Sequence, residues 1–333
     1  IIWALEKAAQ NGKQVTVLME VKARFDEENN IHMARRLEKA GAHVIYGLVG
    51  LKTHSKCTLI IRREKDGIRR YVHVATGNYN ASTAKLYTDL GIFTCSDTFG
   101  ADASAFFNLL SGYSDPPVWD SFLVAPINLR ERCVALIDRE IQHVKNGENG
   151  HIIAKMNSLL DSRMVDKLYE ASQAGVKIEL IVRGICVLIP GIPGVSDNIT
   201  VRSLVGRFLE HSRVFWFNNG GREELYIGSA DWMPRNLNDR VELMIPVKDT
   251  DCMHRIKNMV LKELADNQKA HIMQSNGTWV KMIASENKVC AQEYFQKLAE
   301  QRGEQEHGAG QAVGERYAAE QAALGRVEGG TAH

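Results

Sequence analysis

The chain has 333 residues, 44% hydrophobic and 24% charged, which excludes a disordered or fibrous protein and allows two domains with a core each. A formal net charge of +1 provides no overall basic field for nucleic acid, so any anion site must be local. With no apolar run of roughly 18 residues, no expected signal peptide and six scattered cysteines lacking a C-x-x-C pair, the sequence favours a cytoplasmic protein with reduced thiols.

Helices and strands alternate along the first half. In chain order we expect a helix up to residue 11, a strand at 15–21, a helix ending at 40, a strand at 43–46, strands from 54 and at 71–74, and a helix around 100–112. The turn at Asp66-Gly67 joins the last two strands into a hairpin, and the basic residues 62–70 around it predict a solvated hairpin end. Ile1 lies in the middle of an amphipathic pattern, so we expect sequence upstream of it.

The second half repeats this order. Residues 171–178 resemble residues 8–15, and each segment runs into a strand that ends near an arginine, Arg183 or Arg24. The spacing from that arginine to a later histidine is nearly the same in both halves, from 24 to 54 and from 183 to 211. Two copies of one α/β domain with a cleft between them explain this register.

Three segments follow from the repeat. We expect a first α/β domain at 1–118, a second at 119–300 and a disordered low-complexity tail at 301–333, where glycines interrupt an Ala/Glu/Gln-rich stretch. Both domains are expected to contain mixed sheets flanked by helices.

Each copy carries a histidine followed two residues later by a cation, in His54-Ser55-Lys56 and His211-Ser212-Arg213. A glycine-led polar loop follows in both copies, Gly77-Asn78-Tyr79-Asn80 and Gly228-Ser229-Ala230-Asp231. A neutral imidazole can attack phosphorus while neighbouring cations neutralise phosphoryl oxygens. The paired motif therefore predicts a phosphoryl-transfer site.

Strand geometry adds candidate phosphate ligands. If each histidine begins a strand, His54, Lys56 and Thr58 share one face, and Lys56 points with His54 toward the cleft. Arg24 and Arg183 follow apolar strands at the edge where open α/β sheets bind ligands, and arginine suits phosphate. Asn78, Asn80 and Ser229 are loop candidates for phosphate, whereas Asp231 is expected to orient a histidine.

Several longer motifs carry a family resemblance. They are Lys22-Ala23-Arg24-Phe25-Asp26-Glu27-Glu28, Gly50-Leu51-Lys52-Thr53-His54-Ser55-Lys56, Thr76-Gly77-Asn78-Tyr79-Asn80, Lys85-Leu86-Tyr87-Thr88-Asp89, Val182-Arg183-Gly184, Ser196-Asp197-Asn198-Ile199 and Ser229-Ala230-Asp231-Trp232-Met233. From residue 1 to about 300 the chain resembles the catalytic half of a bacterial polyphosphate kinase of the phospholipase-D-like class. The resemblance implies two tandem phospholipase-D-like α/β domains with the active site in the cleft between them.

The resemblance also implies residue roles. His54 would be the phosphorylated nucleophile, His211 an assisting acid or base that contacts ATP, and Arg24 part of a site shared by Mg²⁺ and phosphate. Tyr87 and Arg183 would contact ATP, and the remaining candidates for ATP and phosphate binding are Lys56, Arg213, Asn78 and Asn80.

The implied reaction passes the γ-phosphoryl group of ATP through a phosphohistidine to the end of a polyphosphate chain, reversibly, with Mg²⁺ as cofactor. Expected partners are ATP or ADP and inorganic polyphosphate, with no nucleic acid, a homo-oligomer when full length, and peripheral membrane association left open. The alternatives are a phospholipase-D-like phosphodiesterase, which needs a diester substrate, and an inactive polyanion-binding fragment.

Overall fold

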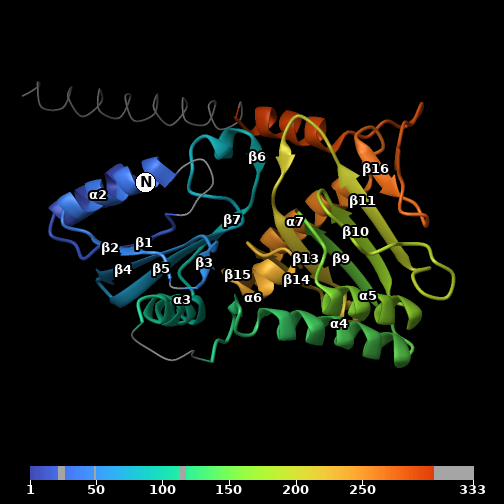
Figure 1. Cartoon of the computed structure of the whole chain (residues 1–333), viewed down its shortest axis with the longest axis horizontal. Coiled ribbons are helices and arrows are strands. Elements are labelled where there is room, and N and C mark those ends of the chain that lie inside the picture. Colours follow the sequence, from blue (N-terminus) through green and yellow to red (C-terminus); the bar gives the residue numbers. More distant parts are fainter. Residues whose placement is uncertain (22–26, 49, 113–117, 304–333) are drawn as a thin grey trace, which may run out of the picture.

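The computed structural model describes residues 1–21, 27–48, 50–112 and 118–303, which form two α/β halves lying side by side (Figure 1). The elements of the first half are α1 (Ile2–Gln10), β1 (Thr16–Met19), α2 (Glu27–Lys39), β2 (His43–Tyr46), β3 (Lys52–Thr53), β4 (Cys57–Glu64), β5 (Gly67–Ala75), η1 (Thr83–Lys85), β6 (Tyr87–Thr88), β7 (Gly91–Thr94) and α3 (Asp97–Leu110). The predicted helices, the strand at 43–46 and the hairpin of β4 and β5 are confirmed.

The second half is longer. Its elements are β8 (Leu123–Ala125), α4 (Leu129–Lys145), β9 (His151–Met156), α5 (Ser162–Gln173), β10 (Lys177–Val182), β11 (Ile199–Leu204), β12 (Leu209–Glu210), β13 (Arg213–Phe217), η2 (Asn219–Gly221), β14 (Glu224–Gly228), α6 (Pro234–Asn238), β15 (Arg240–Pro246), α7 (Thr250–Leu264), β16 (Ala270–Met273) and β17 (Trp279–Lys281). Residues 291–303 are helical, and residues 304–333 of the predicted tail lie outside the described residues. No helix in the described ranges is long and apolar enough to cross a membrane.

The sheets are mixed, as predicted. A 10-stranded sheet runs in the order β17-β16-β11-β10-β9-β13-β14-β15-β3, with β8 also paired to β15. Its strands β9, β10 and β11 are parallel neighbours, whereas β13, β14 and β15 pair antiparallel. In the first half, β1 and β2 form one parallel pair, and β4, β5 and β7 form a separate antiparallel sheet.

Two layers of apolar side chains hold these sheets. Helices α4 and α5 cover one face of the large sheet (Figure 1), and α5 contributes an apolar stripe at helical spacing that includes Met164, Leu168 and Ala171. A second buried cluster joins α7 and the opposite sheet face to α3 and β5, through residues such as Phe106 and Val74. Because this cluster draws on both halves, it fixes their relative position and hence the geometry of any site between them.

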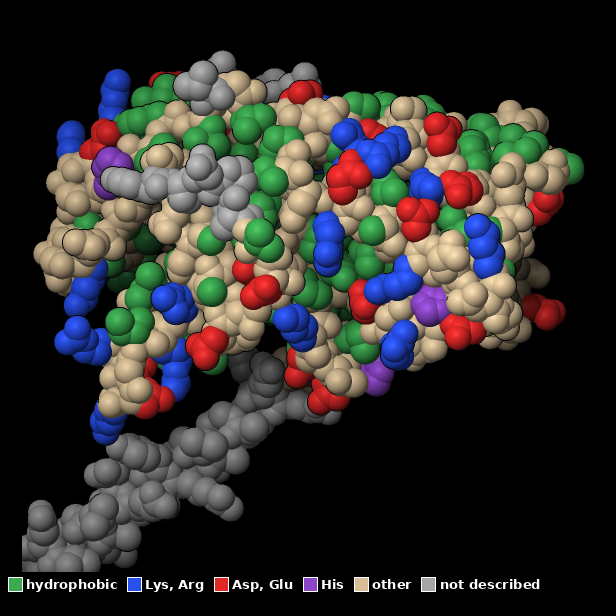
Figure 2. All heavy atoms as spheres, turned by 90° about the horizontal axis from the view of Figure 1, so that it is seen from below, with side chains coloured by type: hydrophobic (Ala, Val, Ile, Leu, Met, Phe, Trp, Pro, Cys, Tyr) green, Lys and Arg blue, Asp and Glu red, His purple; other side chains and the backbone are tan. Residues whose placement is uncertain are grey.

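The β4–β5 hairpin carries the run of basic residues predicted for its end. Arg62, Arg63 and Lys65 are exposed, and Arg69 pairs with Asp66 in the turn at 2.5 Å. Figure 2 shows Lys and Arg side chains standing out at the end of the molecule that carries this hairpin. The solvated interpretation of the charge run is therefore confirmed for Arg62, Arg63 and Lys65, whereas Arg69 and Arg70 are half-buried.

Candidate active site

Two short parallel ladders join the halves. Strand β3 pairs with β15, so that Thr53 lies opposite Val241, and β12 pairs with β6, so that Glu210 lies opposite Thr88. Each of the two candidate histidines directly follows one strand of its ladder, and a carboxylate residue directly follows the paired residues of the other strand: Glu242 within β15 and Asp89 after β6. Each histidine of the repeat is therefore placed next to an acidic residue of the opposite half.

His54 is held by β15. Its backbone N–H and that of Ser55 both donate to the Val241 carbonyl, at 2.9 and 3.0 Å, and its Nδ1 lies 2.8 Å from Oε2 of Glu242. The prediction that each histidine begins a strand is wrong, because β4 begins only at Cys57 and β13 only at Arg213. Two consecutive N–H groups directed at one carbonyl break the strand alternation at this point.

Glu242 is fully buried and accepts two further hydrogen bonds, from Ser229 Oγ at 2.5 Å and Asn236 Nδ2 at 2.6 Å. Burial acts to raise the pKa of this carboxyl, but the charge and hydrogen bond of His54, with Lys56 nearby, hold the pKa below its ordinary value. An ionised carboxylate requires a proton on Nδ1 of His54. The lone pair of the imidazole then resides on Nε2, in a side chain that is 20% exposed.

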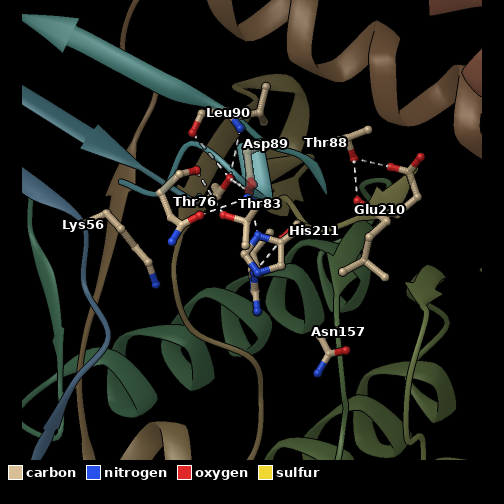
Figure 3. Close-up of polar contacts among 12 residues, drawn as sticks. Lys56, Thr76, Thr83, Thr88, Asp89, Leu90, Asn157, Glu210 and His211 are labelled. Atoms are coloured by element: carbon tan, nitrogen blue, oxygen red, sulfur yellow. Dashed lines mark hydrogen bonds and ion pairs between the residues drawn. The ribbon is translucent and has the colours of Figure 1, made fainter. Parts of the chain in front are cut away.

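His211 is held in the same way by the first half. Its N–H donates to the Thr88 carbonyl at 3.1 Å, and its Nδ1 lies 2.8 Å from Oδ1 of Asp89. Thr76 Oγ1 also donates to Asp89 Oδ1 at 2.6 Å, which fixes the carboxylate (Figure 3). In Figure 3 Lys56 and Asn157 lie on opposite sides of His211.

Asp231 has another role than predicted. The expectation that it orients a histidine is wrong, because Asp231 accepts from Arg213 Nε at 3.2 Å and from the Asn157 N–H at 2.8 Å. Arg213 is buried in the second half, and a buried cation needs a carboxylate partner. Asp231 supplies that partner, and Asp89 takes the histidine.

The two cations of the repeated motif occupy matching positions. Lys56 Nζ donates to the carbonyl of His54, and Arg213 Nη1 donates to the carbonyl of His211 at 2.5 Å. Burial lowers the pKa of Lys56 to about 7. A buried lysine whose pKa lies near the ambient pH becomes fully protonated when an anion binds beside it.

Arg183 completes the positive side of the site. It follows β10, is half-buried, and its Nε has no hydrogen-bond partner among the described residues. Burial, together with the nearby charge of Arg213, lowers the pKa of Arg183. Two guanidinium groups within electrostatic range of one another, of which Arg213 is also within range of Lys56, favour a multivalent anion such as a phosphate.

Both imidazoles are adapted to stay neutral near pH 7. Burial lowers the pKa of His54 and of His211 below its ordinary value, although each histidine has a carboxylate partner that acts in the opposite direction. The ring of Tyr87 lies 4.9 Å from the ring of His211, measured between centroids. The predicted contact residue Tyr87 is thus at the same site.

The predicted loop residues Asn78 and Asn80 show no hydrogen bond to the histidines or cations of the site among the described residues. Asn80 uses its carboxamide oxygen to accept from the N–H groups of Ser82 and Thr83, at 2.9 and 3.0 Å, and so stabilises the turn that leads into η1. Asn78 is exposed. Arg24, the candidate at the Mg²⁺ and phosphate site, lies outside the described residues.

A resident metal does not fit the described part of the site. No group of three or more His, Cys, Asp or Glu side chains in the described ranges could hold a metal ion. Each carboxylate of the site is already hydrogen-bonded to a histidine, Glu242 to His54 and Asp89 to His211.

Sequence reasoning missed Glu242 and did not assign a role to Asp89. Each directly follows residues that pair with the segment in front of a histidine, Arg240 and Val241 of β15 for Glu242 and strand β6 for Asp89, and this pairing exists only between the halves. The signal available in the sequence was weak: Thr88-Asp89 lies in one of the family motifs, whereas Val241-Glu242 lies in none of them.

Comparison with known proteins identifies the relatives of this chain. The family model for polyphosphate kinase C-terminal domain 1 matches residues 1–116, and that for C-terminal domain 2 matches residues 122–292. The chain is 58% identical to a polyphosphate kinase of Synechocystis sp. over 280 residues, covering 84% of this chain and 38% of the relative. It is 55% identical to a polyphosphate kinase of Halalkalibacterium halodurans over 301 residues, covering 90% of this chain and 43% of that relative.

Solved structures agree. A crystal structure of polyphosphate kinase from Porphyromonas gingivalis superimposes with a TM-score of 0.84 at 40% identity, over 92% of this chain and 47% of that chain. A phosphatidylserine synthase from Haemophilus influenzae shares the fold alone, with a TM-score of 0.54 at 10% identity over 90% of this chain and 84% of that chain. The chain spans about two fifths of the length of the curated relatives it matches.

Proposed function

The chain belongs to the polyphosphate kinase family, and on that premise we propose that it transfers the γ-phosphoryl group of ATP reversibly to the end of a polyphosphate chain through a phosphohistidine at His54. The observation that carries the proposal is the exchange of histidine partners between the halves. Glu242 of the second half bonds to His54, and Asp89 of the first half bonds to His211. Two imidazoles with fixed tautomers beside the cations Lys56, Arg183 and Arg213 are suited to phosphoryl transfer.

His54 is the nucleophile in this mechanism. Its Nδ1–H donates to the ionised Glu242, so Nε2 attacks the γ-phosphorus of ATP. The N–P bond forms as the bond from phosphorus to the β,γ-bridging oxygen breaks, and ADP leaves with that electron pair. Glu242 stabilises the positive ring of the phosphorylated histidine.

The cations neutralise the transferred group. Lys56, Arg183 and Arg213 face phosphoryl oxygens, and the negative charge of the substrate restores the proton that burial makes easy to lose from Lys56. Their role is electrostatic, since phosphoryl transfer passes through a loose transition state that needs positioning and charge neutralisation.

His211 assists at the opposite side of the phosphoryl group. The charge of the incoming phosphates favours its protonated form, and Asp89 keeps Nδ1 bonded so that Nε2 donates toward the leaving oxygen. In the second step a terminal oxygen of polyphosphate attacks the phosphorus, the N–P bond breaks, and free His54 returns. The same steps in reverse make ATP from polyphosphate and ADP.

Mg²⁺ enters as part of the substrate MgATP in this proposal, because the described residues offer it no cluster of ligands. The partners we propose are ATP or ADP and polyphosphate, in a cytoplasmic protein that forms homo-oligomers when full length. Association with a membrane surface remains a prediction.

Labelled ATP tests the proposal. Incubation with γ-labelled ATP should label the protein in an acid-labile, base-stable form, and His54→Ala should abolish the label because no other group can carry the intermediate. His151→Ala is the matched control, since His151 also bonds to a glutamate, Glu179 at 2.8 Å, away from the site. Label that persists in His54→Ala refutes the nucleophile, cleavage of a phosphodiester indicates the phosphodiesterase alternative, and binding without label indicates a polyanion-binding module.

A further inference from the structure

The residue in front of His211 is a buried glutamate, Glu210, which is bonded to three other parts of the chain. Its Oε2 accepts from Lys155 Nζ of β9 at 2.7 Å and from Thr88 Oγ1 of β6 at 2.8 Å. Its Oε1 accepts from Gln292 Nε2 at 2.6 Å. Figure 3 shows the contact between Glu210 and Thr88. The backbone that carries His211 is therefore tied to the first half, to the large sheet and to the helix that carries Gln292.

These contacts fix the register of a very short ladder. Strand β12 pairs with β6 through only two residue pairs. Successive side chains of an extended segment point to opposite sides, so Glu210 is directed into the core while His211 faces the site. A slip of one residue would exchange these two directions. The buried partners of Glu210 oppose that slip, and so keep His211 beside Asp89.

The charges around Glu210 favour one arrangement of protons. Burial acts to raise the pKa of Glu210, but the charge of Lys155 and the hydrogen bonds of its three donors lower this pKa to about 2. Burial raises the pKa of Glu263, the second carboxyl bonded to Lys155, to about 8. At neutral pH the cluster therefore contains one cation, one anion and one neutral acid. The anion is Glu210, so the carboxylate next to His211 is the one that the donors hold.

Gln292 also holds the backbone just before Glu210. Its Oε1 accepts from the Phe208 N–H at 3.0 Å, and its Nε2 donates to the Phe208 carbonyl at 2.8 Å. With the bond to Glu210, both hydrogens of the carboxamide are used. A Cβ at Gly206 would overlap Gln292 Oε1, so this glycine leaves the room that the carboxamide occupies. One side chain therefore bonds to two residues of the segment that leads into His211.

The helix that carries Gln292 is itself fixed at its start. Asp266 is buried, and its Oδ2 accepts from the Ala291 N–H at 2.7 Å. Its Oδ1 accepts from the N–H groups of Gln268 and Lys269, at 3.0 and 2.7 Å. A carboxylate that accepts from an N–H group at the start of a helix stabilises that end. Gln292 is therefore anchored to the loop that follows α7.

We propose that Gln292 is a positioning residue for the transfer reaction, and that it keeps Nδ1 of His211 on Asp89. Its bonds to Phe208 and Glu210 hold the β12–β6 ladder in register, so its effect reaches His211 through the backbone. This role rests on the proposed function, in which Nε2 of His211 donates toward the leaving oxygen. Without the carboxamide the segment should shift, and the imidazole should lose its fixed bond to Asp89.

The tautomer of His211 tests the proposal without turnover. A fixed bond from Nδ1–H to Asp89 keeps the neutral ring in the Nδ1–H form, whereas a loosened ring should shift toward the Nε2–H form that free histidine prefers. NMR of the ring nitrogens in the whole 333-residue chain distinguishes the two forms, and His211→Ala identifies the signal by its loss.

Gln292→Met keeps the size of the side chain but removes its hydrogen bonds, so it should shift the His211 ring toward the Nε2–H form. Polyphosphate synthesis should fall on the order of 10- to 100-fold, with the larger effect on kcat than on KM for ATP. Gly206→Ala acts from the other side of the same contact, because its Cβ displaces the carboxamide, and it should shift the tautomer in the same direction. The double variant should shift it no further than the larger single effect.

Gln296→Ala is the matched control, since Gln296 is exposed one turn further along the same helix and bonds to Glu300. It should leave both the tautomer and synthesis unchanged. An unchanged tautomer in folded Gly206→Ala or Gln292→Met would overturn the proposal, and so would an equal shift in Gln296→Ala. A shifted tautomer in a chain that takes no label from ATP would support the positioning of His211 and count against the proposed function instead.

Discussion

Replacement of Glu242 by glutamine should slow phosphorylation of His54. The carboxylate is fully buried and lies 2.8 Å from Nδ1, so it makes a charge-assisted hydrogen bond whose contribution is about 1.5–3 kcal/mol. Glutamine retains an acceptor oxygen but loses the charge that stabilises the positive phosphorylated ring. The rate of label incorporation from γ-labelled ATP should therefore fall roughly 10- to 150-fold.

The same substitution should change the pKa of His54 in a known direction. Glu242 favours the protonated imidazole through its charge and its hydrogen bond, so its neutralisation must lower the pKa of His54 further. An NMR titration of the imidazole measures this shift without any need for turnover. The fold should survive, because Asn236 Oδ1 has no partner among the described residues and a rotated Asn236 amide can accept from the new side chain.

Glu179→Gln is the matched control, because Glu179 also lies 2.8 Å from a histidine nitrogen, that of His151. It should leave both the labelling rate and the pKa of His54 unchanged. If Glu242→Gln labels as fast as Glu179→Gln, the reasoning that Glu242 positions and stabilises His54 is refuted.

Two further substitutions test the opposite side of the site and the core behind it. His211→Ala should reduce polyphosphate synthesis about 10²- to 10⁴-fold with unchanged thermal unfolding, as expected for an acid–base group; equal synthesis would remove His211 from the mechanism. Glu263 is fully buried with Lys155 and Glu210, and burial raises its pKa to about 8. A carboxyl whose folded pKa is raised stabilises the fold below its unfolded pKa of about 4.5 and loses that contribution as pH rises through 8, so the free energy of unfolding should fall across this window. Urea unfolding at about pH 5 and about pH 9 should show a smaller fall in Glu263→Gln, and an identical fall in both proteins would contradict the assignment.

Local patterns in the sequence predicted the elements well but not the contacts between halves. The strand at 43–46 and the hairpin around Asp66-Gly67 follow from alternation and turn chemistry, which act over a few residues. The cation positions Lys56 and Arg213 also followed, because the repeat fixes them relative to each histidine. These predictions needed no knowledge of tertiary structure.

The errors have one cause. The predictions that His54 begins a strand and that Asp231 orients a histidine use only patterns within one half of the sequence. In the structure the segment around His54 is hydrogen-bonded to β15. Asp89, which is more than 100 residues away in sequence, bonds to His211. A ladder of two residue pairs, such as β3 with β15 or β6 with β12, leaves no periodic signal in a single sequence.

The exchange of carboxylates follows the rule of a two-fold symmetric dimer, in which a residue of one subunit contacts a second residue of its partner and the reverse contact repeats the first. Here both contacts lie within one polypeptide, and the symmetry is imperfect: glutamate serves one histidine and aspartate the other, lysine accompanies one and arginine the other. Identical subunits encoded by one gene cannot acquire such differences separately, because every substitution appears twice. Tandem duplication within a single chain removes that restriction, so one histidine can specialise in bond formation while its counterpart is free to diverge.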